Sequence, residues 1–275
     1  MTPKKVALIT GGSAGIGRAS AILFKQNGYE VYAGARRTGQ MADLADMGIH
    51  VISLDVTDRA ANRAAVDRIL EEQGRIDVLI NSAGYGSFGA AEDVPLDEAK
   101  RQLDVNLFGA ADLTQLILPA MRRQRAGRII NISSTGGRMY LPLGAWYVAS
   151  KHALEAYTDS LRLEVKSFGI HPIIIEPGGT ATEWQQVTND RLLASTPQES
   201  VYRPLAERFA SISQGGFMTA EQVARVIYKS AVAAKPKHRY VPGVGNRALM
   251  FVIKHASTPL IDRLMGQLMN RMSKA

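Results

Sequence analysis

The sequence of 275 residues contains no cysteine, which excludes disulfide bonds, cysteine-ligated zinc and cysteine nucleophiles. Histidine is also rare, and the five histidines show no ligand-like spacing along the chain. Protein metal sites are built from closely grouped histidine, cysteine or carboxylate side chains. We therefore expect no metal site.

Long hydrophobic runs are missing as well. The longest stretch without Asp, Glu, Lys or Arg is the 14 residues from Val78 to Ala91, whereas a membrane-spanning helix needs about 20 apolar residues. The apolar run after Lys4 and Lys5 ends before Gly11 and is too short for the core of a signal peptide. With 46% hydrophobic and 21% charged residues the composition is that of an ordinary globular protein, and we expect a cytoplasmic one.

The net charge of +8 comes almost entirely from the C-terminal part of the chain. Residues 235–275 contain eight Lys and Arg against a single acidic residue, Asp262, which leaves the first 234 residues close to neutral. A nucleic-acid-binding protein usually carries its basic face on the folded domain. We therefore expect no nucleic-acid partner.

Short runs of β-branched residues alternate with segments of helical period. This alternation predicts an α/β fold with a doubly wound, Rossmann-like parallel sheet and a helical C-terminal extension. The predicted strands cover residues 6–10, 30–35, 51–54, 76–81, 128–133, 170–175 and 238–241, and the predicted helices cover 15–27, 59–73, 97–125, 146–168 and 219–234.

Chain length and this pattern predict one dinucleotide-binding and catalytic domain over residues 1–245. Within it, residues 177–216 are polar, contain three prolines and follow a predicted strand, a position that fits either a substrate lid or an irregular surface excursion. Residues 246–275 form an amphipathic basic extension. Such a helix commonly packs over a pocket or on a partner subunit, and the alternative is peripheral contact with an anionic membrane.

A glycine-rich segment, residues 10–17, lies between the first predicted strand and helix. Glycines there allow a tight turn and close approach to a pyrophosphate, whose charge is stabilised by the helix N-terminus. The next predicted strand ends in Ala35-Arg36-Arg37, where an NAD site needs a carboxylate and a 2′-phosphate needs arginine. These two features predict NADP(H) as the cofactor.

Tyr147 and Lys151 are four residues apart at the start of a predicted helix, which places the phenol and the ammonium on one helix face. A nearby ammonium favours the phenolate and lowers the tyrosine pKa. Such a tyrosine can act as a general acid and base toward a hydroxyl or a carbonyl.

With these motifs in place, residues 4 to about 242 resemble a short-chain dehydrogenase/reductase of the Tyr/Lys type. The resemblance also includes Asn81-Ser82-Ala83-Gly84, Asn106 in Val-Asn-Leu-Phe-Gly, Ser134 in Asn-Ile-Ser-Ser-Thr-Gly-Gly, and Pro177-Gly178 followed by Thr182. It implies four catalytic residues: Asn106, Ser134, Tyr147 and Lys151. It implies a cofactor site made of Thr10, Gly11, Ser13, Gly15, Ile16, Gly17, Arg36, Arg37, Asp55, Val56, Asn81, Ala83, Gly84, Tyr147, Lys151, Pro177, Gly178, Thr180 and Thr182.

The resemblance gives each of these residues a role. Ser134 would hydrogen-bond the substrate oxygen, with Ser133 as the alternative, and Asn106 would order a water in a proton relay. Asp55 would accept from the adenine amine, Asn81 with Gly84 would line the adenosine ribose, and Thr182 would lie near the nicotinamide carboxamide.

These implied roles predict an NADP(H)-dependent enzyme that interconverts a carbonyl and a secondary alcohol. Its substrate is expected to be apolar if Met139, Tyr140, Leu141, Pro142, Leu143 and Trp146 line the pocket; they fit the core equally well. A looser resemblance to the hydroxysteroid and retinol dehydrogenase-like branch points to steroid-, retinoid- or lipid-like substrates. A homodimer or homotetramer is implied through the helix 97–125 and the Tyr147 helix. The alternative function is a non-catalytic NADPH-binding sensor or scaffold.

Overall fold

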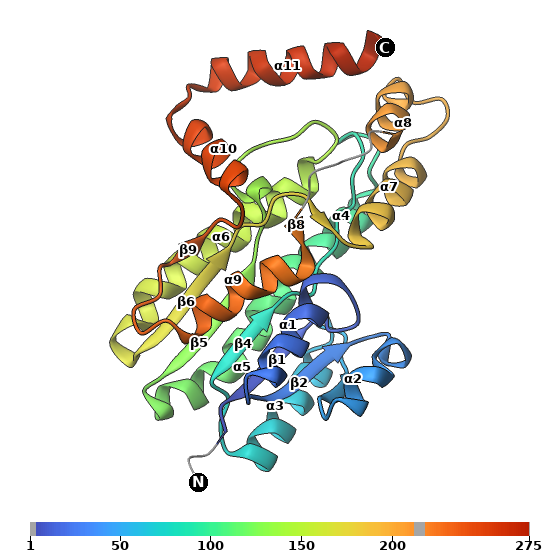
Figure 1. Ribbon diagram of the computed structural model, residues 1–275. Helices are drawn as coiled ribbons and strands as arrows, with labels where there is room; N and C mark the ends of the chain where they lie inside the picture. The colour runs from blue at the N-terminus through green and yellow to red at the C-terminus, as the bar shows by residue number, and fades with distance from the viewer. Residues whose placement is uncertain (1–3, 212–217, 275) are drawn as a thin grey trace.

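A computed structural model describes the backbone of residues 4–211 and 218–274, and their side chains except at 185 and 268–274. Seven parallel strands form the central sheet in the order β3-β2-β1-β4-β5-β6-β9 (Figure 1). The strands are β1 (Val6–Thr10), β2 (Glu30–Ala35), β3 (His50–Ser53), β4 (Val78–Asn81), β5 (Gly127–Ile132), β6 (Ile170–Ile175) and β9 (Arg239–Tyr240). A separate two-stranded sheet pairs β7 (Thr180–Ala181) with β8 (Met218–Thr219).

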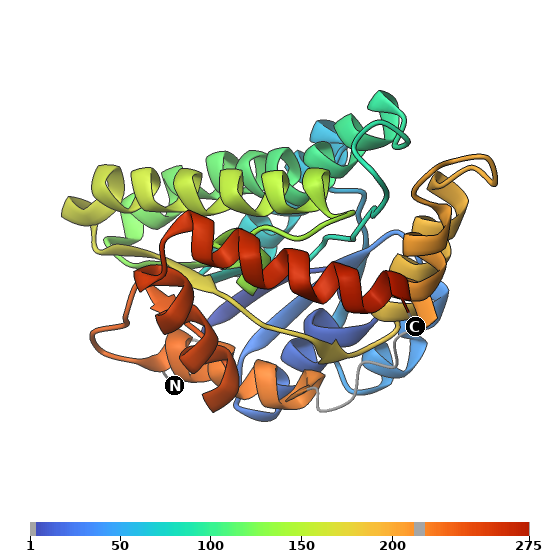
Figure 2. The same ribbon diagram turned by 90° about the horizontal axis from the view of Figure 1, so that it is seen from above.

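Helices cover both faces of the sheet, because successive side chains of a strand point to opposite sides (Figures 1 and 2). The helices are α1 (Gly15–Gln26), α2 (Ala42–Asp46), α3 (Arg59–Gln73), α4 (Leu96–Leu103), α5 (Gly109–Gln124), α6 (Ala145–Val165), α7 (Trp184–Ser195), α8 (Arg203–Ser211), α9 (Ala220–Val232), α10 (Val244–His255) and α11 (Thr258–Lys274). In β1, Ala7 and Ile9 pack with α1 and α9, while Val6 and Leu8 pack with α3, α5 and α6. The predicted doubly wound parallel fold is confirmed.

The predicted helix 97–125 forms three consecutive pieces. A π-helical turn, Asp104–Phe108, joins α4 to α5 and carries the buried Asn106. Single π-helical turns inside α-helices are frequent at functional sites, because they turn a side chain to a place that a regular helix does not reach. The 3.6-residue period alone gives no sign of this insertion.

The segment 177–216, which was predicted to be either a lid or an irregular excursion, is mostly helical up to Ser211, and residues 212–216 lie outside the described part. Its helices α7 and α8 contact each other beside the carboxyl ends of the strands. Leu192 and Ala206 are fully buried between this pair and the rest of the protein. The irregular-excursion interpretation is therefore wrong.

The C-terminal extension consists of α10 and α11. Figure 2 shows α11 lying across the carboxyl ends of the strands and running toward α8, which it contacts. The phenol of Tyr140, after β5, donates a hydrogen bond of 2.7 Å to the carboxylate of Asp262 on α11. None of the described helices is long and apolar enough to cross a membrane.

Candidate active site

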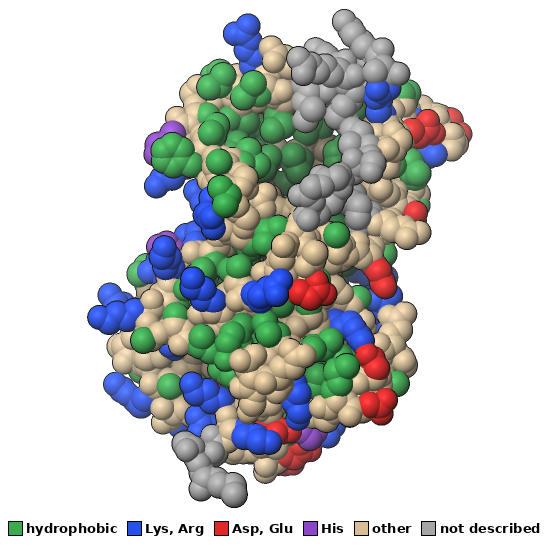
Figure 3. Space-filling model, viewed as in Figure 1, with side chains coloured by type: hydrophobic (Ala, Val, Ile, Leu, Met, Phe, Trp, Pro, Cys, Tyr) green, Lys and Arg blue, Asp and Glu red, His purple; other side chains and the backbone are tan. Residues whose placement is uncertain are grey.

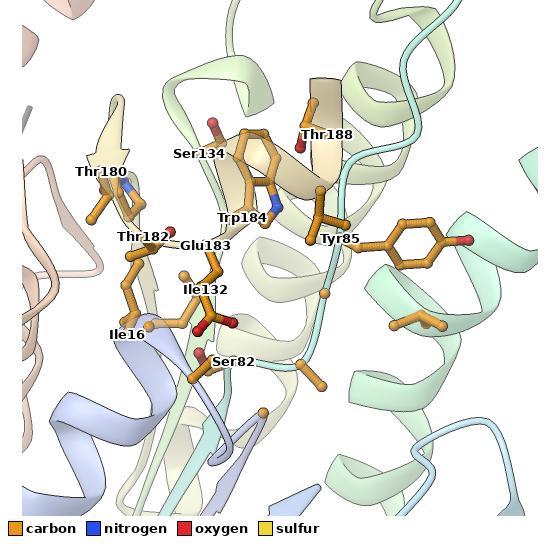
Figure 4. A pocket seen from close by; sticks show the side chains of 18 of the residues that line it. Ile16, Ser82, Tyr85, Ile132, Ser134, Thr180, Thr182, Glu183, Trp184 and Thr188 are labelled. Atoms are coloured by element: carbon orange, nitrogen blue, oxygen red, sulfur yellow. The ribbon is translucent and has the colours of Figure 1, made fainter. Parts of the chain in front are cut away.

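A cavity of about 540 Å³ opens at the carboxyl ends of the strands, where β1 and β4 lie side by side and the strand order reverses. Ligands of open α/β sheets bind in this crevice. Figure 4 shows side chains from well-separated segments converging there, among them Ile16, Ser134 and Trp184. Seventeen of the predicted site residues line it: Gly11, Ser13, Gly15, Ile16, Arg36, Arg37, Asp55, Val56, Ala83, Gly84, Ser134, Tyr147, Lys151, Pro177, Gly178, Thr180 and Thr182.

The glycine-rich segment turns at the mouth of this cavity. Gly11 has φ +69° and Gly15 has φ +53°, values that favour glycine. A Cβ at Gly17 would stand 2.4 Å from the carbonyl oxygen of Gly11, so the loop and α1 can pack this closely only without a side chain. The first turn of α1 carries no acidic side chain, which leaves its positive end available to an anion.

Arg36 and Arg37 are exposed at the end of β2 and line the same cavity. The guanidinium of Arg37 donates a long hydrogen bond of 3.5 Å to Ser13 of the glycine loop. Asp55 accepts hydrogen bonds from the backbone and the hydroxyl of Thr57. Burial raises the pKa of Asp55, but these bonds and the nearby guanidinium of Arg36 lower that pKa below its usual value on balance.

Tyr147 and Lys151 lie on the first turns of α6, and both side chains are buried, 7% and 6% exposed. The ammonium of Lys151 is 5.9 Å from the centre of the Tyr147 ring and donates a hydrogen bond of 2.8 Å to the carbonyl of Ile132. Burial lowers the pKa of Lys151 to about 8. Ser134 follows the end of β5 and is hydrogen-bonded to Tyr147, so Ser134, Tyr147 and Lys151 meet at the carboxyl end of this strand.

Burial raises the pKa of Tyr147 to about 12, although its hydrogen bond with Ser134 acts in the opposite direction. The expected lowering of this pKa by Lys151 is therefore wrong for the protein alone, because desolvation of the phenolate outweighs the favourable interactions. At neutral pH Tyr147 is a neutral phenol, the protonation state of a general acid.

Asn106 lies behind these groups, outside the wall of the cavity. Its carboxamide donates to the carbonyl of Tyr85 and accepts from the amide of Tyr85, both at 3.0 Å. It also donates to the hydroxyl of Ser150, at 3.0 Å. The side chain thereby ties the segment after β4 to α6 at the residue that precedes Lys151, and so fixes their spacing.

The family can be read from the comparison with known proteins. Residues 5–192 match the model of the short chain dehydrogenases. The chain belongs to the short-chain dehydrogenase/reductase family. It is 36% identical to VdlC of Helicobacter pylori, named as a short-chain type dehydrogenase/reductase, over 94% of this chain and 96% of the relative. It is 32% identical to the NADPH-dependent 3-dehydrocapnine reductase of Ornithobacterium rhinotracheale, over 96% of this chain and 95% of the relative.

Solved structures of this family share the fold. A short-chain dehydrogenase from Streptomyces avermitilis has a TM-score of 0.81 and 30% identity, over 98% of this chain and 96% of that chain. A serine dehydrogenase complexed with NADP⁺ has a TM-score of 0.75 and 25% identity, over 86% and 93%. A Burkholderia phymatum member complexed with NAD has a TM-score of 0.79 and 25% identity, over 91% and 92%. The family thus uses nicotinamide cofactors of both kinds, and this short-chain dehydrogenase/reductase is an oxidoreductase.

Three of the predicted cofactor residues do not line the cavity of this short-chain dehydrogenase/reductase: Thr10, Gly17 and Asn81. Thr10 accepts hydrogen bonds from the amides of Ser82 and Ala83 and so holds the loop after β4 against β1. Gly17 provides the close packing described above. Asn81 is turned into the core, where its amide donates a bond of 2.8 Å to Asn131. Its side chain lies on the sheet face that α5 and α6 cover, not in the wall of the cavity where the motif implies a ribose.

Ser134 and Ser133, which the sequence left as alternatives, have different surroundings. Ser134 is paired with Tyr147 and accepts a hydrogen bond of 3.0 Å from the amide of Gly136. The hydroxyl of Ser133 points away and donates to Glu155, at 2.8 Å. Of the two serines, therefore, only Ser134 places its hydroxyl beside the phenol of Tyr147.

The part of the cavity near Tyr147 is lined by residues that the motifs did not identify. They come from the segment after β4 and from α7 and α8, and they are Tyr85, Phe88, Trp184, Val187, Thr188, Arg191 and Phe209. The rings of Phe88 and Trp184 lie 5.3 and 5.5 Å from that of Tyr147. Of the six apolar residues between Ser134 and Tyr147 only Leu141 lines the cavity, while Met139 and Leu143 are buried. The scattered aromatic residues of the polar segment 177–216 were the available signal.

Proposed function

We propose that this enzyme interconverts an apolar ketone and the corresponding secondary alcohol with NADP(H), and that Tyr147 is its acid and base. The observation that carries the proposal is the convergence of Ser134, Tyr147 and Lys151 on one cavity. Arginines line the cavity at its opposite, β2 end, and aromatic rings surround the tyrosine. The positive-φ glycine turn fits a dinucleotide phosphate, and so does the positive end of α1, whose first turn carries no acidic side chain.

A bound nicotinamide cofactor supplies hydride to the carbonyl carbon, or accepts it from the alcohol. In reduction, the phenol of Tyr147 donates a proton to the carbonyl oxygen, and the phenolate must be protonated again before the next turnover. The hydroxyl of Ser134 holds the same oxygen as negative charge develops on it. The ammonium of Lys151 stabilises the phenolate that remains, because an opposite charge nearby favours the charged form.

Support for NADP(H) over NAD(H) comes from the end of β2. A guanidinium matches two phosphate oxygens at once, whereas NAD requires a carboxylate that accepts from the ribose hydroxyls. The sequence has no Asp or Glu between Glu30, at the start of β2, and Asp43, and Arg36 and Arg37 stand at its end. A relative of nearly the same length is an NADPH-dependent reductase.

Support for an apolar substrate comes from the rings and alkyl groups around Tyr147. Phe88, Leu141, Trp184, Val187 and Phe209 all face the cavity. Desolvation of an apolar substrate on this wall contributes roughly 25 cal/mol for each Å² buried. We therefore propose steroid-, retinoid- or lipid-like carbonyl compounds as the substrates of this enzyme.

We also propose that the enzyme forms a homodimer or homotetramer through α4, α5 and α6. Large apolar side chains are exposed along this face, with Phe108 57% and Leu163 67% exposed. Covering them against a second copy removes apolar surface from water. The molar mass in solution, measured by light scattering for the wild type and for Leu163→Glu, tests this: a monomeric wild type contradicts it.

The test of the function is the variant Tyr147→Phe with a panel of aliphatic, steroid and retinoid ketones, assayed with NADPH and NADH. Removing the phenolic proton should lower kcat by at least about 100-fold, while NADPH still binds in a fluorescence titration. Unchanged turnover would contradict the role of Tyr147. Tight NADPH binding without turnover of any carbonyl compound would favour the alternative, a nucleotide sensor.

A further inference from the structure

Helix α10 turns its apolar side to the solvent. Met250 is 4% exposed and anchors the helix, whereas Val244, Phe251 and Val252 on the other side are 73%, 67% and 51% exposed. At about 100° per residue these three lie roughly 100–160° around the helix from Met250. A surface helix of a globular protein normally has the reverse arrangement.

Helix α11 extends this apolar surface. Ile261 is only 9% exposed, on a helix that packs against α8, but Leu260 and Leu264, one turn apart, are 48% and 50% exposed. Figure 3 shows the result: hydrophobic side chains gather at the upper left, where Figure 1 places α10, with Lys and Arg beside them. We call the exposed side chains of Val244, Leu249, Phe251, Val252, Leu260 and Leu264 the tail patch.

The charges around the tail patch are of one sign. Arg247 and Lys254 are exposed, seven residues apart along one edge of α10, and Arg263 is exposed on α11. Asp262 is the single acidic residue in 235–275, and it is bound by Tyr140. An apolar surface with a cationic border complements the surface of an anionic bilayer, where apolar side chains enter the headgroup region and cations stay near lipid phosphates.

We propose that the tail patch binds the surface of an anionic lipid bilayer, without spanning it. A second copy of the chain is disfavoured as the occupant, because in a two-fold symmetric contact the same patch meets itself. Such a contact would bring the positive charges of both tails together with no acidic side chain of the tail free to neutralise them. Lipid phosphates supply the missing negative charge.

Helices α10 and α11, which carry the tail patch, border the cavity. Asn246 of α10 packs against Gly178, where a Cβ would stand 2.4 Å from its carboxamide oxygen. Helix α11 is held by Tyr140 and packs on α8, the helix that brings Phe209 to the cavity wall. If the proposed function holds, a bilayer-bound enzyme meets lipid-like substrates next to this opening. Bilayer binding itself does not depend on that function, and its test requires no turnover.

The experiment is co-sedimentation of the full chain with vesicles of phosphatidylcholine, with and without phosphatidylglycerol. The wild type should bind the anionic vesicles only, and added salt should weaken binding, because salt screens the cationic border. Phe251→Ser with Val252→Ser should weaken binding at least tenfold, about the effect of losing one well-buried apolar side chain. Arg247→Gln and Lys254→Gln should each weaken it about fivefold.

Matched controls lie outside the tail. Val201→Ser removes an apolar side chain that is 82% exposed, before α8, and Arg123→Gln removes an exposed cation at the end of α5. Both should bind anionic vesicles as the wild type does, with an unchanged Tm in every variant. Wild-type protein that stays in the supernatant, or equal binding by the Phe251 and Val201 variants, would overturn the proposal. A Phe251 variant whose molar mass falls while its vesicle binding persists would instead assign the tail patch to a second copy.

Discussion

The hydroxyl of Ser133 donates a hydrogen bond of 2.8 Å to the carboxylate of Glu155. This bond joins the two segments that carry the proposed catalytic residues. Ser133 precedes Ser134 just after β5, and Glu155 lies one helical turn after Lys151 on α6. Arg239 of β9 donates to Glu155 at 3.1 Å and forms an ion pair of 3.0 Å with Glu176. A buried charged cluster thus supports the active site from the core side.

We predict that Glu155→Gln shifts the alkaline limb of the reduction pH profile to lower pH. The negative charge of Glu155 favours the ammonium of Lys151, so its removal lowers the Lys151 pKa further. The glutamine still accepts from Ser133, which keeps the geometry. The measurement is kcat/KM for ketone reduction as a function of pH.

Asp159→Asn is the matched control, because Asp159 pairs with the same Arg239, at 2.5 Å, without acting on Lys151. Its alkaline limb should coincide with that of the wild type. If the alkaline limb shifted equally in both variants, then Arg239, and not Glu155, would set the pKa of Lys151.

A second prediction concerns the pH profile of the wild type. Burial lowers the pKa of Lys151 to about 8, so its charge is present below pH 8 and is lost above it. The reduction rate should therefore fall as the pH rises through about 8, while alcohol oxidation, which needs the Tyr147 phenolate, should continue to rise. Lys151→Arg should remove the limb near pH 8, since arginine stays charged. A limb that persists at the same pH in this variant would assign it to another group.

The stability of the fold should also depend on pH through Glu176. Burial raises the pKa of this fully buried carboxyl group to about 7, and the repulsion from Glu155 acts in the same direction. A carboxyl group that binds its proton more tightly in the folded state stabilises the fold below its unfolded pKa, and this contribution is lost as the pH rises through the folded pKa. The wild-type Tm should fall between about pH 4.5 and pH 7, and Glu176→Gln should flatten this dependence. Equal slopes in the two proteins would contradict the assignment.

The cofactor preference is tested by Arg36→Ala combined with Arg37→Ala. Loss of two guanidinium groups at a 2′-phosphate should raise KM for NADPH by about 100-fold or more, since charge-assisted bonds contribute about 1.5–3 kcal/mol each. KM for NADH should change little. The control Arg123→Ala removes a distant exposed charge and should alter neither. Comparable turnover with both nucleotides in the wild type would defeat the preference for NADP(H).

The sequence predicted the parts of the site that follow strands. Arg36 and Ser134 stand at strand ends, and the carboxyl ends of parallel strands meet at one edge of the sheet, so their convergence with Tyr147 was foreseeable. The walls contributed by Trp184 and Phe209 were not, because they depend on how α7 and α8 fold over the cavity, which no local period encodes. The sequence also could not show that the apolar side of α10 faces the solvent. The spacing of apolar residues shows that a helix is amphipathic, but not which of its sides is buried.

The last prediction separates a structural role of Asn81 from a role in cofactor binding. Asn81 donates to Asn131, which donates to Thr158 of α6, at 2.8 Å in both cases, and all three residues are buried. Asn81→Ala leaves a buried acceptor unpaired, which should lower the free energy of unfolding by about 1–3 kcal/mol. The Kd for NADPH should stay within about threefold, because this side chain does not face the cavity, whereas Asn27→Ala at the exposed end of α1 should change stability by less than about 0.5 kcal/mol. Denaturant unfolding and a fluorescence titration measure the two quantities. A large rise in Kd with little loss of stability would return Asn81 to the ribose position that its motif implied.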